Sequence, residues 1–180
     1  MRRKDILKAM KRHAFDEDII CQFEHIEKTD KGFHSRNKRF VEKMDELLIE
    51  EQRLLLWEDG GRCIGGKTGE RAKEFAQTLK GTLAEKIAWL KENAHMYGVE
   101  LNDDGTITAY CRCHCLQGRI NAPEKDVVRT KTPSAYGCSA GAAFHNITKA
   151  LGIQARIKSI DYPQEGDDKN HMTFVIEITE

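Results

Sequence analysis

The chain has no long hydrophobic run, no excess charge of either sign and few prolines. No apolar stretch approaches the ~20 residues that a membrane-spanning helix needs. Lys and Arg together number 29, as do Asp and Glu, so there is no net positive field to attract nucleic acid or an anionic membrane. With three prolines and 32% charged residues of balanced sign, the composition is not that of a disordered chain. We therefore expect an ordered protein that binds neither nucleic acid nor membrane.

The amino terminus also lacks the features of a signal peptide. Met1-Arg-Arg-Lys leads into a charged, amphipathic stretch instead of an apolar core with a cleavage site. We therefore expect a cytoplasmic location, where thiols stay reduced. In that setting the six cysteines favour metal ligation, redox chemistry or small buried side chains over disulfides.

Residues 1–96 carry the periodicity of amphipathic helices. Apolar side chains recur at helical spacing in five stretches: 4–14, 16–31, 33–57, 70–79 and 83–94. Asp16 or its neighbour is placed to cap the second of these helices. The stretch 33–57 predicts one long amphipathic helix or two shorter ones. The sequence therefore predicts a helical region over 1–96.

From residue 97 onward the pattern changes to short strands. The predicted elements are a hairpin of 99–101 and 106–110, an exposed loop of 116–135, a helix of 139–151 ending at Gly152, and two strands of 153–162 and 172–178. Residues 97–180 therefore predict a small-molecule- or metal-binding domain, a β-β-α-β-β antiparallel sheet with one packed helix. The whole chain is predicted to be α+β.

Three cysteines alternate along the segment TITAYCRCHC, at Cys111, Cys113 and Cys115. On an extended strand they share one face, with neighbouring thiols roughly 6–7 Å apart. That spacing is long for two ligands of one zinc ion, whose bonds to sulfur are about 2.3 Å. A bend, or a partner such as Cys138 or His171, must complete the site. We predict a site that uses some of these five residues, with Zn²⁺ as its candidate cofactor, or else a thiol-lined pocket without metal.

Cys138 directly precedes the predicted helix 139–151. The positive end of a helix favours a thiolate, which would act as a metal ligand or as the nucleophile of a dyad with His171 or His114. His145 would be displaced from it by about 10 Å along a continuous helix, so we assign His145 to packing or to the surface. Cys138 is the one catalytic candidate, and no G-x-S-x-G or H-E-x-x-H signature accompanies it.

Residues 61–68, GRCIGGKT, match the phosphate-binding pattern G-x-x-x-x-G-K-[ST]. That chemistry requires a buried strand before the loop and a helix after it. Here Glu58 and Asp59 precede the loop within a stretch that has the pattern of a charged helix. We interpret the segment as a glycine-rich connection between helices, with nucleotide binding as the alternative.

The carboxy-terminal pattern resembles two related groups of proteins. The matching stretches are YGCSAG at 136–141, Leu151-Gly152 and GDDKNHMTFVI at 166–176, with a looser match of GGRC at 60–63. One group is the 4-vinyl-reductase-like hydrocarbon-binding domain of bacterial and archaeal sensors. The other is the bacterial family labelled L-2-amino-thiazoline-4-carboxylic acid hydrolase-like, which carries a Cys-Gly-Arg-x-Cys-type segment.

The resemblance implies a small aromatic or apolar ligand near a structural zinc ion, as in the sensors. This chain departs from the family pattern at two positions. His171 stands where the pattern has a cysteine after the Gly-Asp turn, and Gly137 stands where a second cysteine is often found. Histidine for cysteine still permits zinc ligation.

These observations predict a bacterial, cytoplasmic small-molecule-binding protein with a Cys/His-lined, zinc-containing or metal-free site. One alternative is a hydrolase of a small cyclic amide- or thiazoline-like substrate, with Cys138 or a zinc-bound water as the attacking group. The other is a non-catalytic interaction module that forms a homodimer through its helical half. The sequence does not identify the ligand.

Overall fold

The computed structural model describes residues 3–30, 32–60, 66–93, 98–112, 133–162 and 171–179. The helices before the first strand are α1 (Arg3–Arg12), α2 (Glu17–Thr29), α3 (Phe33–Leu47), α4 (Glu50–Gly60), α5 (Gly66–Thr78) and α6 (Leu83–Asn93). The later elements are β1 (Gly98–Leu101), β2 (Ile107–Arg112), α8 (Pro133–Leu151), β3 (Ala155–Asp161) and β4 (His171–Ile178). The predicted α+β class and the helical amino-terminal half are confirmed. The β-β-α-β-β order stays a prediction, because 113–132 and 163–170 lie outside the described residues.

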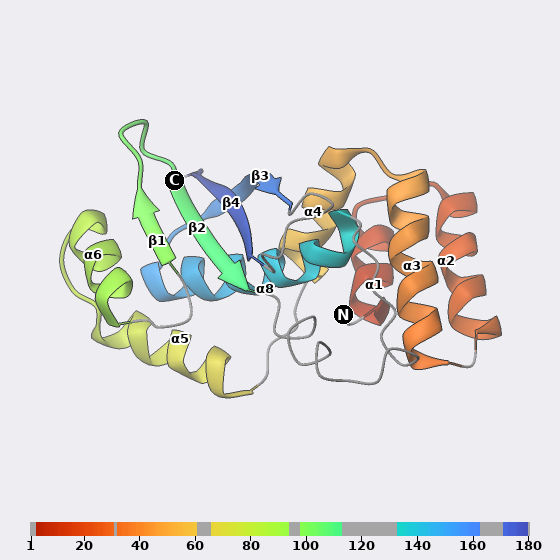
Figure 1. The fold of residues 1–180 in the computed structure, drawn as a ribbon, viewed down its shortest axis with the longest axis horizontal. Coiled ribbons are helices and arrows are strands. Elements are labelled where there is room, and N and C mark those ends of the chain that lie inside the picture. The colour runs from red at the N-terminus through yellow and green to blue at the C-terminus, as the bar shows by residue number, and fades with distance from the viewer. Residues whose placement is uncertain are drawn as a thin grey trace.

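The four strands form one antiparallel sheet in the order β1-β2-β4-β3. Helix α8 contacts β2, β3 and β4 and crosses one face of the sheet (Figure 1). Helices α5 and α6 lie at one end of the molecule, and α1, α2 and α3 lie at the other (Figure 1). Because α8 also contacts α3, α4 and α5, it connects the two ends.

Local chemistry explains two of the predicted elements. Asp16 is the N-cap of α2, and its carboxylate accepts the backbone N–H of Asp18 at 2.8 Å, as predicted. The turn between β1 and β2 closes with hydrogen bonds from Asn102 N to the Thr106 carbonyl at 2.8 Å and from Gly105 N to the Asn102 carbonyl at 3.0 Å. Gly105 has a φ of 81°, a conformation that glycine adopts at little cost. The predicted hairpin is confirmed.

The structure selects one of two predicted alternatives and moves one predicted boundary. The stretch 33–57 forms two helices, because Leu48 takes an extended conformation at the end of α3. Helix α8 begins at Pro133 and not at 139, so the end of the predicted loop 116–135 is helical, while 116–132 lies outside the described residues. Proline is favoured at the first position of a helix, where its missing N–H needs no partner. The predicted end of this helix at Gly152 is confirmed.

One hydrophobic core extends across both predicted regions, 1–96 and 97–180. It contains Phe23 and Trp57 from the helices and Ile147 and Phe174 from α8 and the sheet, all buried. None of the described helices has both the length and the apolar composition to cross a membrane.

Candidate functional site

The structure describes two of the four cysteines predicted for the site. Cys111, near the carboxyl end of β2, and Cys138, in α8, are both buried and both free of disulfides. Cys113 and Cys115 lie outside the described residues. The residues that are described contain no group of three His, Cys, Asp or Glu side chains arranged to hold a metal ion. The predicted ligand set is thus placed only in part.

His171 opens β4, and its side chain lies outside what the structure describes. The sheet register pairs the backbone of His171 with Arg112, and that of Cys111 with Met172. The backbone of His171 is therefore next to Cys111 along the β2–β4 ladder. The register partner of Cys111 is Met172 and that of His171 is Arg112, so the ladder does not place His171 opposite Cys111.

Cys138 does not lie at the start of its helix. Since α8 begins at Pro133, Cys138 falls in the second turn, where its backbone N–H belongs to the helical hydrogen-bond ladder. The effect of the helix dipole is concentrated in the first turn. The prediction that the helix end stabilises a Cys138 thiolate is therefore wrong, and the thiol is instead buried among core side chains.

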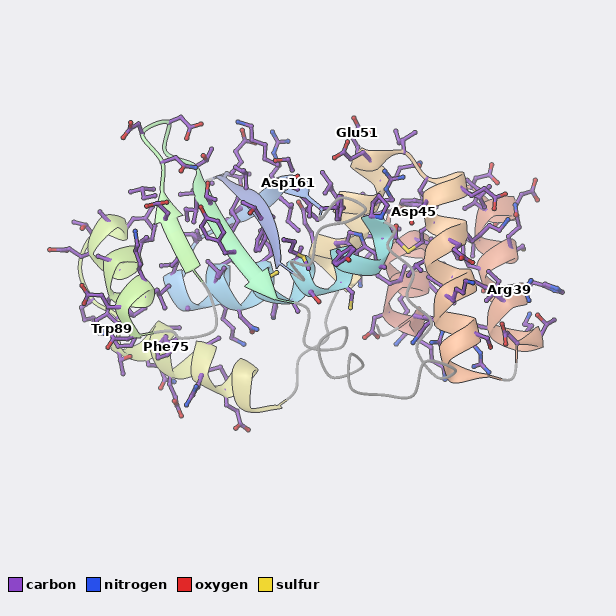
Figure 2. The ribbon with its side chains drawn as sticks, viewed as in Figure 1. Arg39, Asp45, Glu51, Phe75, Trp89 and Asp161 are labelled. Atoms are coloured by element: carbon purple, nitrogen blue, oxygen red, sulfur yellow. The ribbon has the colours of Figure 1, made fainter. Side chains whose placement is uncertain are left out.

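The first turn of α8 is held by a carboxylate from α3. Asp45 accepts the backbone N–H of Ser134 at 3.1 Å and the Ser134 hydroxyl at 2.7 Å. Ser134 is fully buried, so these bonds satisfy donors that water does not reach. Figure 2 shows Asp45 on α3 beside the amino-terminal end of α8. Asp45 thus caps a helix to which it is not adjacent in the sequence.

Arg53 of α4 balances the charge of this cap. Its Nε lies 3.8 Å from a carboxylate oxygen of Asp45, and its Nη1 donates to the Leu48 carbonyl at 2.6 Å. Tyr162, directly after β3, lies close enough to Arg53, Glu50 and Asp45 for their charges to act on the pKa of its hydroxyl. Burial has the largest effect and raises that pKa. At neutral pH Tyr162 is therefore a neutral phenol that does not add charge to the cluster.

Helix α4 meets α8 at a close contact between Trp57 and Gly137. A Cβ on Gly137 would lie 2.0 Å from the indole Nε1 of Trp57, far inside any real contact. Trp57 is completely buried, and its Nε1 has no hydrogen-bond partner among the described residues. Gly137 therefore allows the indole to lie against the α8 backbone, directly beside Cys138 in the chain.

Glu58, the residue after Trp57, reaches the sheet. Its carboxylate accepts the backbone N–H of Ile157 in β3, where the β3–β4 register shifts between Ile157 and Ser159. Burial raises the pKa of the Glu58 carboxyl, and the Ile157 N–H and the charge of Arg156 oppose that shift. The contact attaches α4 to an irregular position of an edge strand.

A groove of about 550 Å³ lies between α2 and α3. Cys21 and His25 line it from α2, and Arg39, Glu42, Lys43 and Glu46 line it from α3. Cys21 is an exposed, free thiol. The charges are paired locally, with Lys43 Nζ 2.7 Å from Glu46 and Arg39 3.9 Å from Asp30. This groove was not predicted from the sequence.

The glycine-rich segment 61–68 follows a helix. Helix α4 ends at Gly60 and α5 begins at Gly66, while 61–65 lie outside the described residues. The buried strand that phosphate binding requires before this pattern is replaced by α4. The flanking elements are those of a connection between two helices.

Comparison with known proteins adds no further assignment. No protein-family model, curated protein or solved structure matches the chain. The resemblance to the hydrocarbon-binding and hydrolase-like families therefore stays a hypothesis based on the residues quoted for it.

The cluster of Asp45, Arg53, Trp57 and Tyr162 around α8 was missed by sequence reasoning. Asp45, Arg53 and Trp57 are close in sequence, but Tyr162 and helix α8, which they meet in the fold, lie much later in the chain, and no motif spacing links them. One signal was available: Pro133-Ser134 is a typical start of a helix, and it would have placed Cys138 inside α8.

Proposed function

We propose that this chain is a small-molecule-binding protein whose site is built on Cys111 of β2 and Cys138 of α8. The single observation that carries the proposal is the placement of Cys111 and Cys138. Both are buried and reduced, and they stand on either side of the segment that carries Cys113 and Cys115. Chain connectivity keeps the Cα of Cys113 within about 7 Å of that of Cys111.

Zn²⁺ is the cofactor that this donor set favours, because thiolates and imidazole are its common ligands in proteins. Cys111 and Cys138, with Cys113, Cys115 or His171, would supply them. A site closed by four protein ligands would be structural, whereas an open position would allow a bound water to attack a substrate. Reduced thiols in such a site fit the cytoplasm as the location.

The hydrolase alternative keeps only part of its support. Cys138 in the second turn of α8, buried in the core, is poorly placed as a nucleophile. Hydrolysis of a small cyclic amide or thiazoline would therefore depend on a zinc-bound water. Binding without catalysis is the function that the described geometry supports better.

The test combines zinc analysis of the purified, untagged protein with thiol titration under native conditions. We expect about one zinc per chain, as for a closed four-ligand site, and slow reaction of the buried thiols. Cys111→Ser, Cys113→Ser and Cys138→Ser should each lower the zinc content, whereas Cys21→Ser, which changes an exposed thiol on α2, should not. Full zinc content in all three site variants would exclude this ligand set. A metal-free protein with freely reactive thiols at 111 and 138 would contradict the proposed site altogether.

A second candidate function is self-association through the α2–α3 groove, and the charge order on α3 favours it. Along α3 the groove residues alternate as Arg39, Glu42, Lys43 and Glu46. If a second copy packs antiparallel about a two-fold axis between 42 and 43, Arg39 faces Glu46 and Glu42 faces Lys43 of that copy. A two-fold interface requires this self-complementarity. Surface ion pairs contribute only about 0–1 kcal/mol each, so the homodimer would be weak and sensitive to salt.

Sedimentation velocity at low ionic strength tests this arrangement through charge reversal. Arg39→Glu alone and Glu46→Arg alone each place like charges opposite one another and should abolish the dimer. The double variant Arg39→Glu/Glu46→Arg restores the pairing and should restore the dimer. A wild-type protein that is monomeric at all concentrations, or a double variant that stays monomeric while wild type dimerises, would reject this interface.

A further inference from the structure

Cys21 and His25 lie four residues apart on α2, and both line the groove between α2 and α3. On a helix this spacing puts two side chains on the same face, with their Cβ atoms about 5–6 Å apart. Two ligands at positions i and i+4 of one helix bind the same zinc ion in the H-E-x-x-H pattern. Both side chains are exposed, and neither the thiol nor the imidazole has a hydrogen-bond partner among the described residues. The pair therefore offers two metal ligands that the fold does not otherwise use.

A single copy of the chain does not complete this site. A structural zinc ion has four protein ligands, and the described residues contain no third His, Cys, Asp or Glu arranged with the pair to hold a metal ion. Glu46 lines the same groove from α3, but its carboxylate is paired with Lys43 Nζ at 2.7 Å. The missing ligands would have to come from outside the described part of the chain. A second copy can supply two of the same kind.

The order of residues along the groove agrees with a two-fold axis. The lining residues are Cys21, Gln22, His25 and Ile26 from α2, and Arg39, Glu42, Lys43 and Glu46 from α3. The α3 set is centred between 42 and 43, where the axis of the proposed homodimer passes, and the α2 set is centred between 23 and 24. Because α2 and α3 lie side by side (Figure 1), an axis through the middle of the groove crosses both helices near these points. A two-fold axis then brings Cys21 of each copy opposite His25 of the other.

The four side chains come close enough to share one ion. At 1.5 Å per residue, Cys21 and His25 of both copies fall within about 8 Å of one another along the helices. Zinc bonds of about 2.0–2.3 Å, added to the lengths of the side chains, cover that span. Zn²⁺ with two thiolates and two imidazoles carries no net charge. It therefore adds no unpaired charge to a groove in which Arg39 and Lys43 already balance Glu42 and Glu46.

We propose that Cys21 and His25 of two copies form a shared Cys₂His₂ zinc site that tightens the homodimer. This inference rests on the proposed self-association, and it adds the ion that completes the interface and the two residues that bind it. Each thiol releases its proton to the buffer when zinc binds. A monomer offers only two of the four ligands, so the site requires dimerisation, and the zinc content of the isolated monomeric protein does not depend on Cys21.

Sedimentation velocity of the full chain, as isolated and under nitrogen, tests this proposal. The protein is held at a concentration where the zinc-free dimer is a minor species, and ZnCl₂ is added in steps. We expect dimer to form with about one added zinc for every two chains, which is four ligands per ion. Zinc should lower the dissociation constant of the dimer by at least about tenfold, which corresponds to about 1.4 kcal/mol.

Three variants identify the ligands. Cys21→Ser and His25→Gln should each abolish the response to zinc, and both change exposed side chains. Gln22→Ala changes an exposed residue of the same groove that is not a proposed ligand, so it should respond to zinc as wild type does. A response of either ligand variant equal to that of wild type, or a wild-type protein whose association does not change with zinc, would overturn the proposal.

Cobalt(II) provides a spectroscopic measurement of the same site. Co²⁺ added to wild type should produce a thiolate-to-cobalt charge-transfer band in step with dimer formation, and Cys21→Ser should lack that increment. Equal spectra for wild type and Cys21→Ser would show that Cys21 is not a ligand and would overturn the proposal.

Failure of the metal site and failure of the homodimer give different results. A dimer that forms at low ionic strength, is abolished by Arg39→Glu and does not respond to zinc would remove the metal site and leave the homodimer. A zinc-dependent dimer that Arg39→Glu does not weaken would retain Cys21 and His25 as ligands and remove the charge-paired interface. A protein that stays monomeric at low ionic strength, with and without zinc, would remove both.

Discussion

Asp45 and Ser134 are bonded to each other across 89 residues of chain, through the backbone N–H and the hydroxyl of the serine. The carboxylate of α3 thereby caps α8, the helix that contacts both the sheet and the amino-terminal helices. The stability of the whole molecule should therefore depend on this pair more than on a typical surface carboxylate.

Asp45→Ala should lower the free energy of unfolding by about 1–3 kcal/mol, the range for losing a cap and leaving a buried donor without an acceptor. Urea denaturation followed by circular dichroism measures it. Glu46→Ala, one residue away and exposed, is the matched control and should change stability by less than about 0.5 kcal/mol. Equal effects of the two substitutions would show that the cap does not contribute.

Gly137→Ala should destabilise the protein by about 1–3 kcal/mol or more, because its new methyl group overlaps the Trp57 indole. Replacing Trp57 with leucine is itself costly, since it removes a large buried ring. The double variant should nevertheless be more stable than the sum of the two single effects predicts. Additive effects in this double-mutant cycle would mean that positions 137 and 57 have no interaction energy with each other.

Glu58→Gln should gain stability relative to wild type as the pH rises. Burial raises the pKa of Glu58 above its ordinary value of 4.5, so the folded state binds the proton more tightly than the unfolded state does. The contribution of Glu58 is therefore fully present below the unfolded pKa and is lost as the pH rises through the folded pKa. Glutamine keeps an oxygen acceptor for the Ile157 N–H and does not titrate.

Unfolding free energies of wild type and Glu58→Gln at several pH values between about 4 and 7.5, the range in which a raised carboxyl titrates, measure this difference. Glu51→Gln, at an exposed position of the same helix, is the control, and its unfolding free energy should differ from that of wild type by an amount that does not change with pH. If the difference between Glu58→Gln and wild type is also independent of pH, the raised pKa of Glu58 is contradicted.

Among the three described cysteines, Cys21 should react first with a thiol reagent. It is exposed on α2, whereas Cys111 and Cys138 are buried, and access limits thiol reactions as much as the thiolate fraction does. Peptide mapping after a short native pulse of iodoacetamide measures the order. Labelling of Cys138 as fast as Cys21 would indicate that α8 opens readily or that this thiol is accessible.

The parts of the fold that the sequence predicts are those governed by near neighbours. Asp16 caps α2 from the adjacent position, and the turn at Gly105 closes a hairpin within a few residues. Hydrophobic periodicity likewise predicts both the helical half and the strands. In each case the residues responsible are only a few positions apart in the sequence.

The parts that could not be predicted depend on tertiary contacts. Asp45 has the pattern of an ordinary surface residue of α3, and only the arrival of α8 gives it a partner. Trp57 and Gly137 each look unremarkable alone, and their contact depends on how α4 crosses α8. For the site, the sequence predicts a group of cysteines, of which the structure describes Cys111 and Cys138 as buried, and it misplaces Cys138 relative to its helix.

The capping of α8 from α3 also has a consequence for the order of biosynthesis. A ribosome releases α3 and α4 long before it reaches Ser134, so Asp45 and Trp57 emerge with no helix to receive them. The bonds from Asp45 to Ser134 and from Glu58 to Ile157 span 89 and 99 residues, and long-range contacts of this kind slow folding. The nascent amino-terminal half therefore exposes the surface that α8 later covers, and these contacts form only after Ser134 and Ile157 have been synthesised.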